Sequence, residues 1–200
     1  LARVCYLGAD TALFRPLGSP KVNCVVSVGY LSPRKGFDFV IRGLGLLEPP
    51  RRPRLVIISN SGEPAERQFL EELARQQGVD VEFRTLVSDV DLVSAYDQAL
   101  LTLYAPIMEP FGLVALESMA CGTPVVGVRE AGLRETVVHG ENGLLAERDE
   151  AGFAAAVSGL LEDSGRREAY GRQSRADVEA NWSWERTVEN LEQHLRCAAE

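Results

Sequence analysis

The chain has 200 residues, 46% of them hydrophobic, and a formal net charge of −8 at pH 7. Its length suits one domain with a sizeable core, and its acidity argues against nucleic acid, which needs a clustered positive face. No apolar run approaches the roughly 20 residues of a membrane span and no signal peptide is visible, so we expect a cytoplasmic protein. Four scattered cysteines without a C-x-x-C pair predict isolated buried thiols in a reducing compartment: Cys5, Cys24, Cys121 and Cys197.

The first 20 residues show no helical pattern and are punctuated by glycine and proline. We therefore expect residues 1–20 to be an incoming interdomain linker, with one short strand at Val4–Leu7. Because the chain begins at Leu1 rather than at Met, we expect it to be part of a longer protein. Residues 21–200 are expected to form the domain.

From Asn23 onward, short β-branched runs alternate with helical patterns. Apolar residues at successive positions, as in most of these runs, are typical of strands covered on both faces. This alternation predicts an α/β fold, a Rossmann-like doubly wound parallel sheet of about six strands with helices on both faces. The predicted strands are Asn23–Gly29, Arg54–Ser59, Val79–Arg84, Leu100–Tyr104, Pro124–Val128 and a short one near Gly143–Ala146.

Apolar residues at helical spacing predict the helices between the strands. Pro64 can open the second helix and Gly78 can close it, while Gly122 and Pro124 end the helix that carries Glu117. From about residue 150 the pattern is helical only. The predicted stripes are Phe37, Val40, Ile41, Leu44 and Leu47; then Phe69, Leu70, Leu73 and Ala74; and in the last helix, capped by Ser183, Trp184, Val188, Leu191 and Leu195.

Ligands of open α/β sheets bind at the carboxyl ends of the strands. Those ends are the loops at 29–36, 59–62, 104–112 and 129–132. Lys35 stands at a helix start, where its charge opposes the helix dipole, so we interpret it as a ligand residue that contacts phosphate rather than a surface lysine. Arg34 is a second candidate. The loop lacks both the Gly-Lys-Ser/Thr of a P-loop and the G-x-G-x-x-G fingerprint.

Two carboxylates, Glu109 and Glu117, lie eight residues apart across a predicted helix start. A helix start offers unpaired N–H groups to an anion, whereas carboxylates accept hydrogen bonds from hydroxyls, so the pair suits a ligand with phosphate in the middle and hydroxyls at both ends. Eight helical residues rise about 12 Å, too far for the roughly 5–9.5 Å carboxyl separations of glycosidases. The alternative is that Glu117 is a solvated helix glutamate and Glu109 an ordinary loop residue.

Other motifs that suggest a metal site or a catalytic nucleophile have simpler interpretations. Asp89-Val90-Asp91 looks like a metal-binding pair, but Ser88 and Asp91 ahead of an apolar run predict a helix capping box. His139 and His194 have no partner at metal-ligand spacing, and G-x-S-x-G is absent, so neither a metal site nor a serine nucleophile is expected.

From about Gly8 to Leu195 the chain resembles the C-terminal, donor-binding half of the retaining glycosyltransferases of family four, the "group 1" enzymes. The resemblance rests mainly on three motifs: residues 28–36, with Leu31-Ser32-Pro33 and Lys35-Gly36; residues 109–117, Glu-Pro-Phe-Gly-Leu-Val-Ala-Leu-Glu; and residues 119–126, Met-Ala-Cys-Gly-Thr-Pro-Val-Val. It implies one half of a GT-B-type enzyme of glycan biosynthesis, with two facing Rossmann-like domains. The family generally needs no metal, so no cofactor is implied.

The resemblance also implies a role for each matching residue. Glu109 would hold hydroxyls of the donor sugar near the reacting carbon, and Glu117 the ribose. Backbone N–H groups of Gly112, Leu113 and Val114 would bind the diphosphate of a UDP-, GDP- or ADP-sugar, with Lys35 neutralising its charge. The loop residues Gly29, Tyr30, Arg34, Gly36 and Phe111 complete the implied donor site. Residues 59–62 and 84–86 are expected to surround the base and ribose.

Two departures from the family pattern change what is expected. The family usually has Arg directly after the first glycine of the loop, where this chain has Tyr30, and Arg34 is our candidate to replace its charge. These 200 residues match only the donor-binding half of the family and not its acceptor domain, so we expect the isolated chain to bind donor without transferring sugar. The alternatives are a non-catalytic sugar-nucleotide-binding module with a degenerate site and a related two-domain enzyme such as a sugar-nucleotide epimerase.

Overall fold

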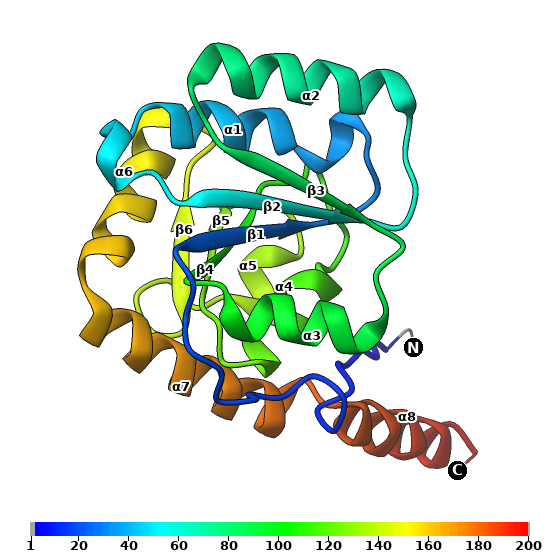
Figure 1. The fold of residues 1–200 in the computed structure, drawn as a ribbon. Helices are drawn as coiled ribbons and strands as arrows, with labels where there is room; N and C mark the ends of the chain where they lie inside the picture. The colour runs from blue at the N-terminus through cyan, green and yellow to red at the C-terminus, as the bar shows by residue number, and fades with distance from the viewer. Residues whose placement is uncertain (1–2, 200) are drawn as a thin grey trace.

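The structure, a computed structural model, describes residues 3–199. Six parallel strands form one sheet in the order β3-β2-β1-β4-β5-β6, with helices on both faces, which confirms the predicted fold class (Figure 1). The strands are β1 Cys24–Val28, β2 Arg54–Ser59, β3 Val81–Thr85, β4 Leu101–Tyr104, β5 Val125–Val128 and β6 Gly143–Ala146. The helices are α1 Phe37–Gly45, α2 Pro64–Gln77, α3 Asp89–Gln98, α4 Leu113–Ala120, α5 Leu133–Thr136, α6 Glu150–Glu162, α7 Ser164–Asn181 and α8 Trp184–Ala199.

Two apolar layers cover the sheet. On one face α1, α2 and α6 bury Phe37, Leu70 and Phe153, and on the other α3 and α4 bury Tyr96 and Leu116. Because both faces are covered, the central strands are apolar at successive positions, as parallel strands must be. Within residues 3–199, no helix combines the length and apolar character that crossing a bilayer requires.

The strand order reverses beside β1. The chain goes from β1 outward to β2 and β3, and then returns to the other side of β1 for β4, β5 and β6. Such a reversal opens a crevice at the carboxyl ends of the two central strands. Here the loops that follow β1 and β4 meet, since the Ile107 N–H donates to the Arg34 carbonyl at 2.8 Å.

Several predicted helix ends are confirmed by the structure. Pro64 begins α2, and Gly78 ends it in a left-handed conformation. Ser88 and Asp91 form the capping box at the start of α3. The Ser183 hydroxyl accepts the Arg186 N–H at 3.3 Å, which caps α8.

The short strand expected at Val4–Leu7 is wrong. Within the described residues none of the six strands pairs with this segment, and its apolar side chains are exposed. Just beyond this segment, Ala9 makes an isolated bridge with Ser183, at the junction of α7 and α8. This segment lies beside a helix junction and not beside a strand, so it has no partner with which to form a β-ladder.

Two other expectations about burial are corrected, those for Phe69 and for the cysteines. Phe69 is 46% exposed, because it lies one residue, and so about 100°, away from the buried stripe of α2. The four stripe residues of α8 are also exposed, so the stripe does not pack on this domain. All four cysteines are free thiols, but only Cys121 is buried, and Cys197 is exposed at the end of α8.

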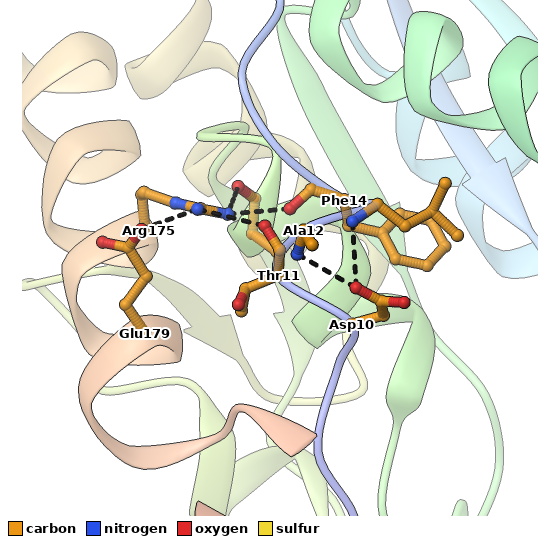
Figure 2. Close-up of polar contacts among 8 residues, drawn as sticks. Asp10, Thr11, Ala12, Phe14, Arg175 and Glu179 are labelled. Atoms are coloured by element: carbon orange, nitrogen blue, oxygen red, sulfur yellow. Dashed lines mark hydrogen bonds and ion pairs between the residues drawn. The ribbon is translucent and has the colours of Figure 1, made fainter. Parts of the chain in front are cut away.

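The segment that leads into β1 is tied to α7 by Arg175 (Figure 2). Its guanidinium donates to the carbonyls of Phe14 at 2.7 Å, Ala120 at 2.9 Å and Thr11 at 3.2 Å, and it pairs with Glu179 at 2.6 Å. Residues 11–14 therefore form part of the folded domain rather than a free tether. That residues 1–20 link this domain to another stays a prediction.

Arg175→Met should lower the free energy of unfolding by about 2–4 kcal/mol, because three carbonyl groups lose their donor at once. Urea titrations of the two proteins measure this difference. Arg172→Met, an exposed change on the same helix, is the control and should stay within about 0.5 kcal/mol of the parent. Equal midpoints for both variants would show that Arg175 does not hold the segment.

Candidate functional site

The loop after β1 folds back on itself to present a lysine. Residues Pro33–Lys35 form a 3-10 turn, and Gly36 ends it with φ 67° before α1 begins. The stem of Lys35 lies over Gly29, where a Cβ would come within 3.3 Å of the lysine Cγ and Cδ. The Lys35 Nζ meets Glu109 Oε2 at 2.6 Å, with both side chains one quarter exposed. The structure thus brings together two of the residues expected to carry the chemistry.

The loop after β4 ends in an open helix start. Gly112 precedes α4 in a left-handed conformation with φ 94°, and it offers no side-chain cap. Within residues 3–199, the N–H groups of Gly112, Leu113 and Val114 donate to no protein acceptor. Orphan N–H groups at a helix start carry a partial positive charge and bind anions. Through its ion pair with Glu109, Lys35 lies at the loop that leads into this open helix start.

Neighbouring segments hold the backbone of the loop after β4 in place. The Gly132 N–H donates to the Glu109 carbonyl at 3.1 Å, and a Cβ at Gly132 would lie 2.3 Å from the Pro110 carbonyl. Arg148 donates to the carbonyls of Ala105 at 3.2 Å and Pro106 at 2.9 Å. Sequence reasoning missed Arg148, because an arginine just after β6 gives no local sign that it reaches the loop after β4.

Glu117 lies one and a half turns into α4, partly buried. The Tyr96 hydroxyl of α3 donates to Glu117 Oε2 at 3.0 Å. Burial raises the pKa of Glu117 to about 7; the Tyr96 hydrogen bond works in the lowering direction, and the Asp89 charge adds a smaller raising effect. Glu117 is therefore not a fully solvated helix glutamate, and its contact with a ribose stays a prediction.

The buried carboxyl of Glu117 should make stability depend on pH. Its pKa in the folded chain lies above the ordinary value of 4.5, so between those two values the folded state holds the proton more tightly. The free energy of unfolding should therefore fall as pH rises from about 4.5 to 7, by up to about 3 kcal/mol. Glu117→Gln should remove this component, and urea unfolding of both proteins at pH 5 and pH 8 tests it. Identical pH dependence in both proteins would contradict it.

Tyr104, the last residue of β4, is buried in the same region. Burial raises its pKa, and the charges of Glu109 and Glu117 raise it further. Sequence reasoning did not single out Tyr96 or Tyr104. Their place depends on how α3 and β4 pack against α4, which no local pattern reveals.

A cavity of about 250 Å³ opens at the carboxyl ends of β1 and β2. Its walls include Gly29, Tyr30, Ser59 and Asp89, and Tyr30 is 48% exposed. Residues 59–61 and Val87 line this cavity, whereas residues 84–86 do not. That the cavity holds a base and ribose stays a prediction.

Arg34 is exposed, and its side chain makes no hydrogen bond or ion pair in the described part of the chain. Its substitution for the missing family arginine stays a prediction. Nor does any group of three or more His, Cys, Asp or Glu side chains among residues 3–199 have the arrangement of a metal site.

Comparison with known proteins decides the family. The profile of "Glycosyl transferases group 1" matches residues 10–177. The chain belongs to the group 1 glycosyltransferases. A D-inositol 3-phosphate glycosyltransferase of Acidothermus cellulolyticus is 39% identical over 94% of this chain and 46% of its own length. The chain thus spans about half the length of this curated relative of the family.

Solved structures show that the fold is that of GT-B glycosyltransferase domains. Sucrose-phosphate synthase from Thermosynechococcus elongatus matches with a TM-score of 0.88 and 29% identity, over 99% of this chain and 53% of that one. Anabaena HepE, solved in complex with UDP and glucose, matches with a TM-score of 0.87 and 23% identity, over 98% of this chain and 57% of that one. The second likeness bears on the fold alone.

Proposed function

We propose that this chain is the donor-binding half of a retaining glycosyltransferase. The observation that carries the proposal is the Lys35–Glu109 ion pair of 2.6 Å beside the open start of α4. A diphosphate placed there would accept hydrogen bonds from the N–H groups of Gly112, Leu113 and Val114. Lys35 would neutralise its charge. The donor is therefore a nucleoside diphosphate sugar, the ligand class that suits a diphosphate site flanked by two carboxylates.

The same geometry suggests how the leaving group departs. As the bond from the sugar to the diphosphate breaks, negative charge grows on the diphosphate, and preorganised donors stabilise growing charge. Each well-placed donor of this kind is worth about 3 kcal/mol. Lys35 leaves Glu109 when it meets the diphosphate, which frees the carboxylate to accept hydrogen bonds from the sugar. Glu117 lies beyond the diphosphate and takes the ribose hydroxyls.

Transfer requires a second domain that supplies the acceptor. The chain spans 46% of a curated relative, which leaves room for such a domain. The exposed apolar stripe of α8, including Trp184 and Leu195, supports contact with it. We expect the isolated chain to bind donor without transferring sugar to any acceptor. The expected cytoplasmic location stays a prediction.

Calorimetric titration of the isolated chain with UDP, GDP and ADP, with and without magnesium, tests the proposal. We expect saturable, metal-independent binding of one nucleotide, weakened in Lys35→Ala and Glu117→Ala. No binding of any of the three would contradict the proposal. Robust sugar transfer by the isolated chain would contradict the need for a second domain.

Tyr30 favours a second candidate, a non-catalytic module with a degenerate site, because tyrosine carries no charge for the diphosphate. We propose instead that Arg34 replaces the missing charge. Arg34→Ala should then weaken nucleotide binding about 10-fold or more, the value of one charge-assisted hydrogen bond, whereas Tyr30→Phe should leave it unchanged. If instead Tyr30→Phe weakens nucleotide binding and Arg34→Ala does not, the Tyr30 hydroxyl makes the contact with the diphosphate.

A further inference from the structure

Three aromatic rings from distant parts of the chain meet beside the candidate site. Tyr6 stacks on Phe111 with ring centroids 5.8 Å apart and an interplanar angle of 19°. Trp182 meets Tyr6 edge-on at 5.5 Å and Phe111 at 5.7 Å. All three separations lie in the range in which aromatic pairs attract each other beyond the burial of their surface. We call Tyr6, Phe111 and Trp182 the aromatic triad.

Backbone hydrogen bonds hold the segment that carries Tyr6 beside Trp182. The Ala9 N–H donates to the Trp182 carbonyl at 2.8 Å, and the Trp184 N–H donates to the Ala9 carbonyl at 3.1 Å. Gly8 lies so close to this pair that a Cβ there would sit 2.4 Å from the carbonyl of Ser183. The segment before β1 and the junction of α7 with α8 therefore form one support, from which the rings of Tyr6 and Trp182 reach Phe111.

The third member of the triad belongs to the anion-binding loop. Phe111 directly precedes Gly112, whose left-handed backbone sets the direction of the first N–H groups of α4. The main chain of Phe111 is already confined on one side, since a Cβ at Gly132 would lie 2.5 Å from the Phe111 Cα. Its ring is confined by Tyr6 and Trp182. Loss of the ring contacts would leave the Phe111–Gly112 link free to turn.

The Tyr6 side chain also lies near α5. Tyr6 and Glu135 line the same pocket, and the Glu135 carboxylate raises the pKa of the Tyr6 hydroxyl. Glu135 belongs to α5, which begins directly after Gly132. Ring stacking is the contact that reaches Phe111, so a phenylalanine at position 6 would retain it.

We propose that Tyr6 and Trp182 are positioning residues that hold Phe111 and so aim the N–H groups of Gly112, Leu113 and Val114 at the diphosphate. The proposal rests on the proposed function. Tyr6 thereby acquires a role in donor binding although it lies outside the sheet, in the segment before β1. A shift of this segment would change the contacts of Tyr6 and Trp182 with Phe111, and so the direction of the N–H groups that face the diphosphate.

The test compares UDP with uridine in calorimetric titrations, or the matching pair for whichever of UDP, GDP and ADP the parent chain binds. Tyr6→Leu should weaken UDP binding about 5- to 10-fold and leave uridine binding unchanged, because only the diphosphate uses the N–H groups. Tyr6→Phe should restore UDP binding. Trp184→Leu, an exposed aromatic change next to the triad, is the control and should leave both affinities unchanged. Tyr6 is 42% exposed, so its replacement should leave the fold intact, which thermal unfolding verifies.

The other outcomes separate this proposal from the function on which it rests. If the parent chain binds none of the nucleoside diphosphates, the proposed function fails and the role of the triad fails with it. If the parent binds UDP and Tyr6→Leu binds it equally well, only the role of the triad is overturned. Equal weakening of UDP and uridine would also overturn it, because a general structural effect does not discriminate between the two.

Discussion

Lys35→Ala is expected to weaken binding of a nucleoside diphosphate about 100-fold. A hydrogen bond to a charged group contributes about 1.5–3 kcal/mol, and here the loss also leaves the Glu109 carboxylate unpaired near the diphosphate. The matched control is Lys21→Ala, because Lys21 donates to the Ala99 carbonyl and the Thr123 hydroxyl, away from the loops of the site. Titration calorimetry of both variants measures the difference. Equal affinities would contradict the phosphate role of Lys35.

Glu109→Gln should act in the opposite direction on the same site. Without the carboxylate, Lys35 no longer has to leave an ion pair to meet the diphosphate, so the free nucleoside diphosphate should bind a few times more tightly. A sugar conjugate of the same nucleotide should lose affinity relative to it, since an amide is a weaker acceptor for sugar hydroxyls than a carboxylate. Tighter binding of both ligands would show that Glu109 does not contact the sugar.

Gly36→Ala is expected to cost both stability and binding. The residue has φ 67°, and an added Cβ would lie 2.0 Å from the Ala105 carbonyl, so the loop after β1 must move away from the end of β4. The left-handed backbone costs about 1–2 kcal/mol for a non-glycine residue, and the forced shift about 1–3 kcal/mol more. Because Lys35 directly precedes Gly36, nucleotide affinity should fall at least 10-fold.

Gly18→Ala is the matched control for this change. Gly18 has φ 74° but no atom within 4 Å of an added Cβ, so it carries the backbone strain without the clash. It should lower the free energy of unfolding by about 1–2 kcal/mol and leave nucleotide affinity unchanged. Urea unfolding and calorimetry of both variants separate the two effects. Similar losses in the two variants would show that the clash with Ala105 is absorbed.

The sequence predicted those features that depend on local patterns. The limits of β2 and β6 agree with the structure, because their apolar runs are bounded by polar or turn residues. The sequence also placed Glu109, Lys35 and Gly112 together, because they follow strands whose carboxyl ends lie on the same side of the sheet; the structure shows Lys35 paired with Glu109. The assignment of the chain to its family rested on the same motifs, which the match over residues 10–177 confirms.

Features that depend on the packing of distant segments were missed. Tyr96 and Arg148 act on parts of the chain that lie far from them in sequence, and nothing in their own neighbourhood indicates it. The contact of Tyr6 with Phe111 and Trp182 likewise requires the pairing of Ala9 with Ser183. The same pairing explains why the Val4–Leu7 strand was wrong, since that segment leads to a helix junction and not to a sheet edge.

The central claim is that the diphosphate of a sugar nucleotide lies at the start of α4 beside Lys35. The most direct test follows the backbone amide resonances of the ¹⁵N-labelled chain while UDP is added. We predict that the largest shifts occur at Gly112, Leu113 and Val114, with further shifts at Gly29 and Gly36. Two results would contradict the account. One is a set of shifts confined to the amino ends of the strands, around Lys21 and Gly122; the other is no shift at saturating UDP, GDP or ADP.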